Sequence, residues 1–299
     1  MKFVLLRNRQ ALAVGLIAVA PALTGCLTHI RTVPKTRPPE VVQSATLDQL
    51  LQQVNQRYDA ISTFTASVEV VASEGGSRQG QIKELTSVGG YIFLRKPEEL
   101  RILLRVPVLG SQALDMVSDG KAWKLWVPSK KIARTGTSQV ADPSQHGLES
   151  LRPKVIFDSL MIKGLGPGQM VSLTQDSRVY PDPKSKKDLV EEPDYELAIL
   201  ADPNDKIIRA LRVIHIGRST LLPYQEDIYG PDGTILTRAY YSEYQTFGDV
   251  SYPTKIKIDR PQDQYGLAIT ITKLVLNQKM DDDQFELKFP EGVLIKTMD

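Results

Sequence analysis

The segment Leu100-Arg-Ile-Leu-Leu-Arg-Val106 alternates side chains at the period of two that a half-buried β-strand requires. Every second residue, from Leu100 through Leu104 to Val106, would lie on one apolar face. The segment Thr254-Lys-Ile-Lys-Ile-Asp259 divides more cleanly, with isoleucines on one face and charges on the other. A sheet built from such strands has one apolar and one hydrated face, which suits a curved sheet or a barrel with its apolar side inward.

Runs of the same kind recur along most of the chain, so the sheet is expected to be large. They cover residues 64–72, 90–95, 113–117, 122–127, 206–217, 235–244 and 266–276. Turn sequences such as Asp119-Gly120 and Pro231-Asp232-Gly233 separate them. Because parallel neighbours need a crossover of about a dozen residues or more, these connections predict an antiparallel meander of about ten strands.

Two helices are expected beside this sheet, which makes the fold class α+β. Thr46 is a candidate N-cap for an amphipathic helix whose apolar side chains recur at helical spacing: Leu47, Leu50, Leu51, Val54 and Tyr58. Residues 153–162 predict a short second helix, which Gly164-Leu-Gly-Pro-Gly168 would end. The charged stretch 181–193 is interpreted as a loop.

Composition excludes several classes of protein. The chain has 299 residues, 41% hydrophobic and 24% charged, with 37 basic and 35 acidic residues and a net charge of +2. The apolar content argues against a disordered chain, and the small net charge does not suggest a nucleic-acid partner. One cysteine excludes a disulfide framework and a cysteine-rich metal site. At about 100–200 residues per domain, the length allows one large domain or two small ones.

The N-terminus is typical of an export signal followed by a tether. Lys2, Arg7 and Arg9 precede an uncharged apolar run at 11–20, which is too short for a bilayer span of about 20 residues. We therefore interpret residues 1–25 as a signal peptide, 26–45 as a proline-containing tether and 46–299 as the folded domain. Removing the signal would take away three basic and no acidic residues, so the net charge of +2 would become −1.

The cysteine lies at the end of this signal. Leu23-Thr24-Gly25-Cys26 resembles the lipobox of bacterial lipoproteins. The resemblance implies cleavage before Cys26 and attachment of acyl chains such as palmitate at that residue. In Gram-negative sorting, Leu27 in place of aspartate implies export to the outer membrane. The alternative for Cys26 is a buried free cysteine.

Catalytic and metal-binding patterns are sparse in the sequence. The three histidines are far apart at 29, 146 and 215, and His215 is interpreted as a structural histidine within a strand. Asp281-Asp282-Asp283 fits a solvated turn before a last strand at 285–289 better than a cation site. Neither a phosphate-binding loop nor a Gly-x-Ser-x-Gly elbow occurs. We therefore expect no enzyme activity, metal or cofactor. Lys130-Lys131 is interpreted as a solvated loop, and the alternative is that it helps to orient the protein at an anionic surface.

Two apolar features stand out. Trp123 and Trp126 are at odd spacing in one predicted strand, so they would point to opposite faces. The connection Val106-Pro-Val-Leu-Gly110 places Val108 and Leu109 where a turn normally carries polar residues. These two side chains either fold back into the core or contact lipid or a partner.

Several segments resemble the lipoprotein-localisation family of LolA and LolB. They are Phe93-Leu-Arg-Lys-Pro-Glu-Glu-Leu-Arg-Ile102, Val117-Ser-Asp-Gly-Lys-Ala-Trp-Lys-Leu125 and Phe285-Glu-Leu-Lys-Phe-Pro290. The Val106–Ser111 connection is similar to the LolB loop that carries an exposed leucine, and Leu109 is the matching position. The resemblance implies an unclosed half-barrel with helices covering its mouth and an apolar lining for lipid tails.

The resemblance also implies a function and its residues. Acyl chains would contact Leu104, Val106, Trp123 and Leu125 on the sheet, with Phe157 and Leu160 on a lid helix and Val108, Leu109 and Gly110 forming a membrane-insertion loop. The protein would be anchored through Cys26 on the periplasmic face of the outer membrane, receive lipoproteins or other lipids from a soluble periplasmic carrier, and insert them. The alternative is a structural or assembly lipoprotein that uses the half-barrel to bind peptide or glycan.

Overall fold

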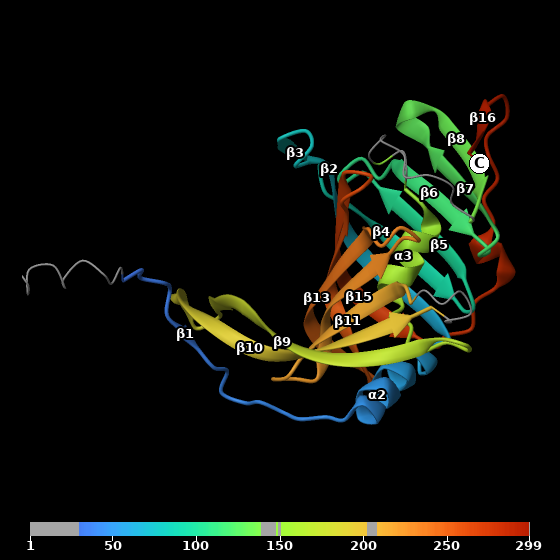
Figure 1. The fold of residues 1–299 in the computed structure, drawn as a ribbon. Helices are drawn as coiled ribbons and strands as arrows, with labels where there is room; N and C mark the ends of the chain where they lie inside the picture. The colour runs from blue at the N-terminus through green and yellow to red at the C-terminus, as the bar shows by residue number, and fades with distance from the viewer. Residues whose placement is uncertain (1–29, 139–147, 149–150, 202–207, 299) are drawn as a thin grey trace, which may run out of the picture. The chain divides into compact units, whose positions relative to one another are not determined.

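The computed structural model describes residues 30–138, 148, 151–201 and 208–298 (Figure 1). The chain divides into two compact units. The small unit comprises residues up to Pro38 together with Val179–Val190, and the large unit comprises Pro39–Arg178 and Glu191–Asp299.

Strands dominate the described part of the chain, and two α-helices accompany them. The helices are α2 (Leu47–Asp59) and α3 (Pro153–Leu160). The strands are β1 (Thr36–Arg37), β2 (Thr63–Gly76), β3 (Gln81–Glu84), β4 (Val88–Arg95), β5 (Glu99–Arg105), β6 (Gln112–Ser118), β7 (Ala122–Val127), β8 (Ile132–Thr137), β9 (Met170–Asp182), β10 (Ser185–Leu200), β11 (Ala210–Gly217), β12 (Leu222–Tyr229), β13 (Ile235–Phe247), β14 (Val250–Arg260), β15 (Tyr265–Leu276) and β16 (Ile295–Met298). The described chain also contains two short 3₁₀ helices, η2 (Pro128–Lys130) and η5 (Asp282–Phe285). None of the helices described is long and apolar enough to cross a bilayer.

All of these strands belong to one sheet. Their order is β1-β10-β11-β12-β13-β14-β15-β2-β4-β5-β6-β7-β8-β16, with β3 added to β2 and β9 to β10. Neighbours are antiparallel except for β1 on β10 and β16 on β8, which are parallel. The two ends of this order do not pair with each other, so the sheet is unclosed. The predicted fold class is confirmed: a large, largely antiparallel, unclosed sheet with two helices, one of them N-terminal.

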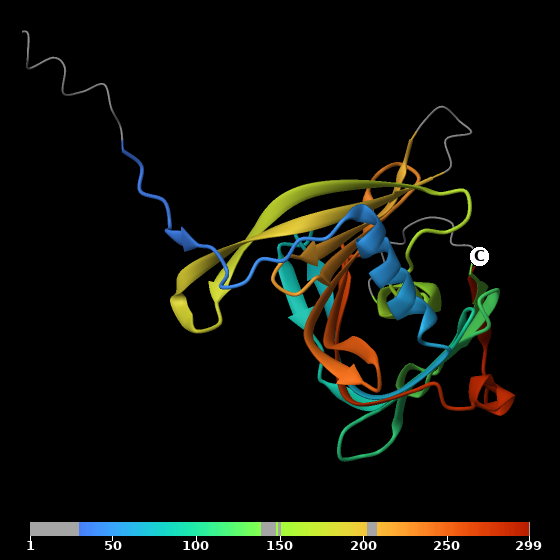
Figure 2. The ribbon, with the colours of Figure 1, turned by 90° about the horizontal axis from the view of Figure 1, so that it is seen from below.

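The inner face of the sheet in the large unit forms the main hydrophobic core. Buried side chains of β2, β4–β7 and β13–β15 pack there against α3, and Figure 2 shows the strands bending around this helix. The predicted alternation holds in β5, where Leu100, Ile102 and Leu104 are buried and the residues between them are less so. Trp123 joins this core while Trp126 packs on the other face, as the odd spacing predicted.

Helix α2 begins at its predicted cap. The Thr46 hydroxyl accepts from Gln49 N–H (3.3 Å), and the Gln49 side chain accepts in return from Thr46 N–H (2.8 Å), which completes a capping box. Leu50 and Val54, in the predicted apolar stripe, are buried against side chains of β10 and β11. The helix and these two strands form a second cluster of buried residues.

Tyrosine hydroxyls hold the C-terminal end of helix α3. The hydroxyl of Tyr252 donates to the carbonyl of Leu160 (2.7 Å), and that of Tyr241 lies 3.0 Å from the carbonyl of Ser159. The last carbonyls of a helix have no partner within the helix, so these side chains supply bonds that the helix lacks. The short helix predicted from residue 153 is therefore tied to β13 and β14 and does not swing freely over the core.

The stretch interpreted as a charged loop is instead part of a hairpin. Strands β9 and β10 run through it, with only Pro183 and Lys184 between them. Charged residues do not prevent strand formation here, because most side chains of β9 stay hydrated while the backbone pairs across the ribbon. Cross-strand pairs add to this, since Arg178 binds Glu192 (2.6 Å) in the large unit.

The C-terminal prediction is also wrong. Residues 286–289 are not a strand; they follow the 3₁₀ helix η5, and Leu287 packs with Trp126 on the outer face of the sheet. The segment buries its apolar side chains against that face, but its backbone does not pair with a neighbouring strand. The alternating sequence therefore does not form a strand. The last strand is β16, which pairs with β8. In the predicted tether, Thr36 and Arg37 form β1, and the boundaries proposed for signal, tether and domain stay predictions.

Candidate functional site

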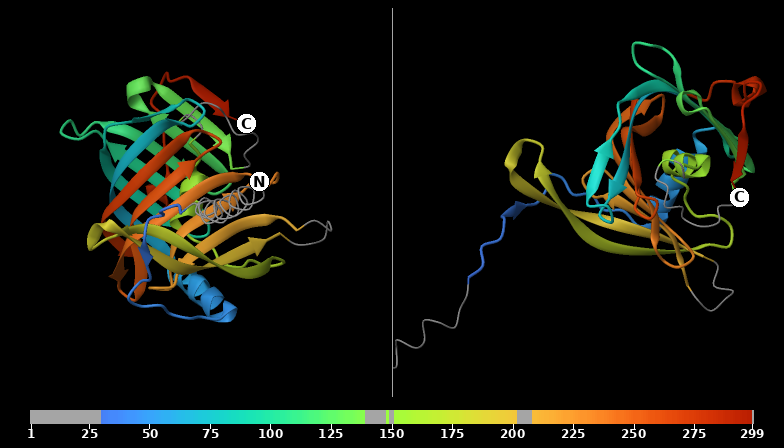
Figure 3. Two further views of the ribbon diagram at one scale, coloured as in Figure 1. Left: turned by 60° about the vertical axis from the view of Figure 1, so that its left-hand side comes forward. Right: turned by 90° about the horizontal axis from the view of Figure 1, so that it is seen from above.

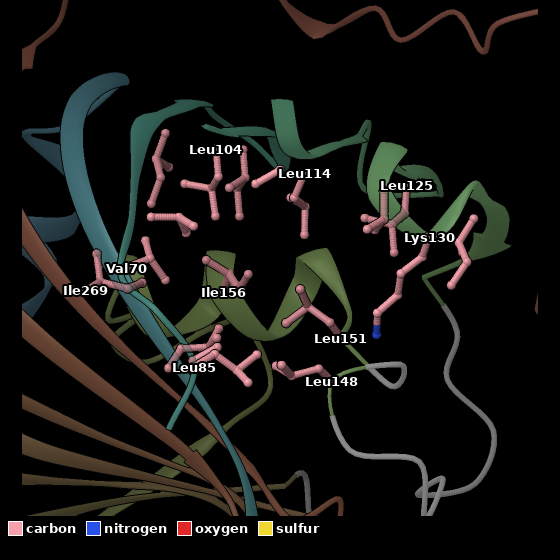
Figure 4. Close-up of a pocket in the computed structure, with 18 of the residues that line it drawn as sticks. Val70, Leu85, Leu104, Leu114, Leu125, Lys130, Leu148, Leu151, Ile156 and Ile269 are labelled. Atoms are coloured by element: carbon pink, nitrogen blue, oxygen red, sulfur yellow. The ribbon is translucent and has the colours of Figure 1, made fainter. Parts of the chain in front are cut away.

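An apolar cavity of about 230 Å³ lies between the inner face of the sheet and α3 in the large unit (Figure 4). Its wall comes from many strands and one helix. The lining residues are Val70, Ala72, Leu85, Val88, Ile92, Ile102, Leu104, Ala113, Leu114, Leu125, Val127, Lys130, Ile132, Arg134, Leu148, Leu151, Ile156, Leu267 and Ile269. A pocket of this kind on the inner face of a curved sheet is the best-formed candidate for a binding site in the described part of the chain.

The alternation of the strands produces this wall. Residues two apart on one strand, such as Ile102 and Leu104 or Leu267 and Ile269, turn their side chains to the same face. The lining also includes two alanines, Ala72 and Ala113. Small side chains at these positions leave space that larger aliphatic residues would fill.

Two cations interrupt the apolar lining. Lys130 ends η2 and Arg134 belongs to β8. Arg134 is only 9% exposed, whereas Lys130 is exposed, so Lys130 lies where the cavity meets solvent. In Figure 4 the Lys130 side chain extends toward Leu151. No acidic residue is among the described residues that line the cavity.

The structure brings together two of the six residues predicted to contact acyl chains. Leu104 and Leu125 line the cavity. Trp123, Phe157 and Leu160 are buried in the adjoining core and take no part in the lining, and Val106 is half-buried after the end of β5. The acyl-binding role of all six stays a prediction.

The apolar connection after β5 is exposed. Val108 is fully exposed, Leu109 is 78% exposed, and Gly110 N–H donates to the carbonyl of Val106 (3.0 Å) to close the turn. Val108 also has a φ of 65°, a left-handed conformation that β-branched residues rarely adopt. Of the two expectations for this turn, folding back into the core is therefore wrong, while its contact with lipid or a partner stays a prediction. The lipobox residues Leu23, Thr24, Gly25 and Cys26 lie outside the described residues.

Sequence reasoning missed several residues of the cavity. The sequence assigns Ile156 only to a helix, Leu148 and Leu151 to no element, and Lys130 to a solvated loop. The helical pattern could have predicted Ile156 as a lining residue, because Ile156 directly precedes Phe157 on the same apolar helix. No local signal marks Lys130 or Arg134, since their place at the cavity depends on pairing between distant strands.

A cluster of polar groups, formed by Glu226, Tyr241 and the carbonyl of Ser159, lies between the sheet and α3. Glu226 is fully buried, and burial raises its pKa to about 7 despite Arg212 nearby (3.8 Å). The hydroxyl of Tyr241 lies 3.1 Å from this carboxyl and 3.0 Å from the carbonyl of Ser159. Because a hydroxyl has a single hydrogen, Tyr241 can donate to Ser159 while a protonated Glu226 donates to Tyr241. This arrangement serves packing of α3, and no group of three or more metal-ligating side chains occurs in the described ranges.

His215 lies in β11 on the opposite, polar side of the sheet from the cavity lining. Its Nδ1 is 3.4 Å from a Glu196 oxygen and its Nε2 is 3.8 Å from an Asp227 oxygen. Arg238 donates to the same Asp227 at 2.7 and 2.9 Å. Burial opposes ionisation of Asp227, yet these bonds lower its pKa to about 2. The histidine thus lies among polar side chains of the neighbouring strands, beside the Arg238–Asp227 ion pair, which agrees with a structural role.

Comparison with known proteins shows a likeness of fold. No protein-family model and no curated protein sequence matches the chain. A DUF1329 family protein from Desulfovibrio piger matches with a TM-score of 0.51 at 12% identity, over 79% of this chain and 94% of that chain. A LolA superfamily protein from Nitrosomonas europaea matches with a TM-score of 0.47 at 13% identity, over 79% and 97%. A domain from Vibrio parahaemolyticus assigned to outer membrane lipoprotein sorting gives 0.45 at 8%, over 80% and 94%. The first of these shows that the fold of this chain occurs in a solved protein.

Proposed function

We propose that this protein is an envelope lipoprotein that binds acyl chains in its cavity and passes lipoproteins or other lipids to the outer membrane. The observation that carries the proposal is the cavity of about 230 Å³, with 17 uncharged, hydrocarbon-lined positions beside two cations. The resemblance of the sequence to LolA and LolB supports the same reading.

The size and chemistry of the cavity suit a hydrocarbon chain. An apolar cavity of about 150 Å³ in another protein stays dry and binds benzene, so this one has room for a larger hydrocarbon group. Each methylene withdrawn from water contributes about 0.8 kcal/mol. A few methylenes in the cavity would therefore hold a lipid tail that cannot cross an aqueous compartment unaided.

The exposed turn is the proposed membrane contact. Keeping Val108 and Leu109 in water forgoes burial of about 2 kcal/mol each. Insertion of both side chains into the acyl region of a bilayer recovers that free energy and brings this turn, with Gly110, to the membrane surface. The loop is thus proposed to deliver the bound lipid.

The anchor and the partners complete the proposal. Acyl chains on Cys26 would hold the protein at the periplasmic face of the outer membrane, because several chains anchor much more firmly than one. A soluble periplasmic carrier is the proposed donor. Transfer would run down a gradient of affinity, from the carrier to this cavity and then to the bilayer. No catalytic step is required.

Native purification tests acyl binding directly. The mature chain carrying Cys26→Ser, exported with the signal of a soluble secreted protein, is purified without detergent and extracted for mass spectrometry. Retained acyl species support the proposal. An empty preparation that retains a stable peptide or glycan partner would instead support the assembly-platform alternative.

A variant of the turn tests delivery. Leu109→Glu should shift lipoproteins away from the outer membrane in fractionated cells, because a carboxylate resists entry into the bilayer. Ile82→Glu is the matched control, since Ile82, like Leu109, is largely exposed (67% for Ile82) but belongs to β3 and not to the turn after β5. Unchanged lipoprotein distribution and growth for Leu109→Glu would exclude a role for the turn.

A further inference from the structure

We propose that the cavity takes a single acyl chain that ends in an anionic group, a carboxylate or a phosphate, with Lys130 as the contact for that group. This inference rests on the proposed acyl-binding function and names the chemical class of its ligand: of the two cargoes proposed above, it selects the other lipids, those with one chain and an anionic end, over lipoproteins. It is carried by the volume of the cavity, the sign of the charges in its lining and the position of Lys130.

The volume favours one chain. At about 230 Å³ the cavity is smaller than the roughly 300–1,000 Å³ of pockets that enclose drug-sized ligands. It exceeds the roughly 150 Å³ that hold a benzene molecule. A bundle of several acyl chains would not fit, whereas a segment of one chain would.

The charges in the lining have one sign. Lys130 and Arg134 are its charged members, and the described lining contains no carboxylate. Arg134 is more than nine-tenths buried and is already engaged in an interaction of its own, so Lys130 is the cation left to attract an anion. An anion at the mouth would supply the partner that Lys130 lacks among the described residues.

Lys130 is available to the ligand. None of the described residues forms an ion pair with it, and its side chain both lines the cavity and reaches solvent. Glu74, which follows Val70 and Ala72 on the same face of β2, accepts a hydrogen bond from the backbone N–H of Leu148 (3.4 Å) and forms no ion pair with Lys130. Lys130 is therefore the cation at the mouth that can pair with an incoming group.

These positions orient the ligand. The tail would lie against Ile92 and Ile102, which are 1% and 4% exposed and so mark the interior of the cavity. The headgroup would remain at the solvent end beside Lys130. A hydroxyl donor is also close to this side of the sheet: Tyr265 shares a face of β15 with Leu267, is buried, and its hydroxyl has no hydrogen-bond partner among the described residues.

Calorimetric titration with ligands of equal chain length tests the inference. The mature chain carrying Cys26→Ser is titrated with laurate, dodecyl phosphate, dodecanol and dodecylamine. Laurate or dodecyl phosphate should bind at least about tenfold more tightly than dodecanol, the factor expected for one charge-assisted hydrogen bond. Dodecylamine should bind most weakly. The ratio of laurate to dodecyl phosphate identifies which anion the mouth prefers.

Matched lysine variants separate the headgroup contact from general electrostatics. Lys130→Gln should remove most of the preference for laurate while dodecanol affinity stays the same, and Lys130→Arg should restore it. Lys131→Gln is the control, because Lys131 is exposed, adjacent and absent from the lining.

The outcomes distinguish the two proposals. Equal affinities for laurate and dodecanol, or equal effects of Lys130→Gln and Lys131→Gln, would overturn the anionic headgroup while leaving acyl binding in place. Failure of all four ligands to bind would overturn acyl binding itself, and the headgroup inference with it.

Discussion

Helices α2 and α3 both bury an apolar face on the sheet of the large unit, yet their interfaces differ. Under α2, Leu50 and Val54 are 0% and 2% exposed and pack on β10 and β11. Beside α3, Ile156 is equally buried but faces the cavity of about 230 Å³. Figure 3 shows both helices against the sheet from two further directions.

The difference teaches that apolar content does not decide whether an interface is filled. Both helices contribute branched aliphatic side chains, and the strands that each helix packs on are rich in isoleucine and leucine. Close packing is achieved where helix and strands meet directly. Where the sheet bends around α3 and its lining includes alanines such as Ala72 and Ala113, the same residue types enclose space instead.

Truncation of a buried leucine should give the largest effect. Leu50→Ala is expected to lower the free energy of unfolding by about 3–5 kcal/mol, because it opens a cavity in a filled interface. Leu125→Ala should cost less, about 2–3 kcal/mol, since Leu125 already borders empty space and has fewer contacts to lose. Urea denaturation of both variants measures the difference, and equal losses would contradict the distinction between the two interfaces.

Stability should depend on pH through Glu226, at the anchored end of α3. Its folded-state pKa of about 7 lies above the ordinary value of 4.5. Between these values only the folded state keeps the proton, so the free energy of unfolding falls as pH rises from 4.5 to 7, by about 3 kcal/mol in total. Glu226→Gln should remove this slope in denaturation series. A slope that persists in the variant would assign it to another group.

Replacing one valine at each interface by a larger residue tests the same difference by adding volume instead of removing it. Val54→Phe should destabilise the protein by about 1–3 kcal/mol, because the α2 interface has no room for a ring. Val70→Phe should be close to neutral, since Val70 borders the cavity, and should weaken laurate binding. Thermal denaturation and calorimetry check the pair. Comparable destabilisation with unchanged laurate binding would show that the cavity is not the acyl site.

The smallest effect is expected at the start of α2. Thr46→Ala removes the cap hydroxyl and should cost about 1 kcal/mol. Helix α3 has no such side-chain cap at Arg152, so Arg152→Ala removes no cap bond there. Amide hydrogen exchange should show faster exchange confined to the first turn of α2 in Thr46→Ala. Unchanged exchange would mean that burial of Leu50 alone stabilises the first turn and that the capping box contributes nothing to it.

Much of the fold could be predicted because its signals are local. The cap at Thr46, the apolar stripe of α2 and the alternation in β5 each depend on neighbours within a few residues. The failures occurred where tertiary contacts override the local pattern. Residues 181–193 form strands because β9 and β10 pair with each other, and Leu287 lies on the outer face of the sheet instead of forming a strand.

Only part of the candidate site could be predicted from the sequence. Leu104 and Leu125 could be assigned to the apolar face by alternation, and the exposure of Leu109 could be posed as one of two outcomes. Trp123 satisfies the same alternation and Phe157 lies on the apolar face of the predicted helix, but both are enclosed by other side chains. Facing inward is a local property, whereas facing empty space depends on every neighbour.

The sequence by itself determined the class of fold, the start of α2, the inward face of the main strands and the apolar character of the turn after β5, because each follows from periodicity or turn chemistry over a few residues. Only the tertiary structure decided that this turn is exposed, that a cavity remains beside α3, and that Lys130 and Arg134 border it. These facts depend on the curvature of a sheet whose neighbouring strands are distant in sequence, and on the space left after all of its side chains have packed.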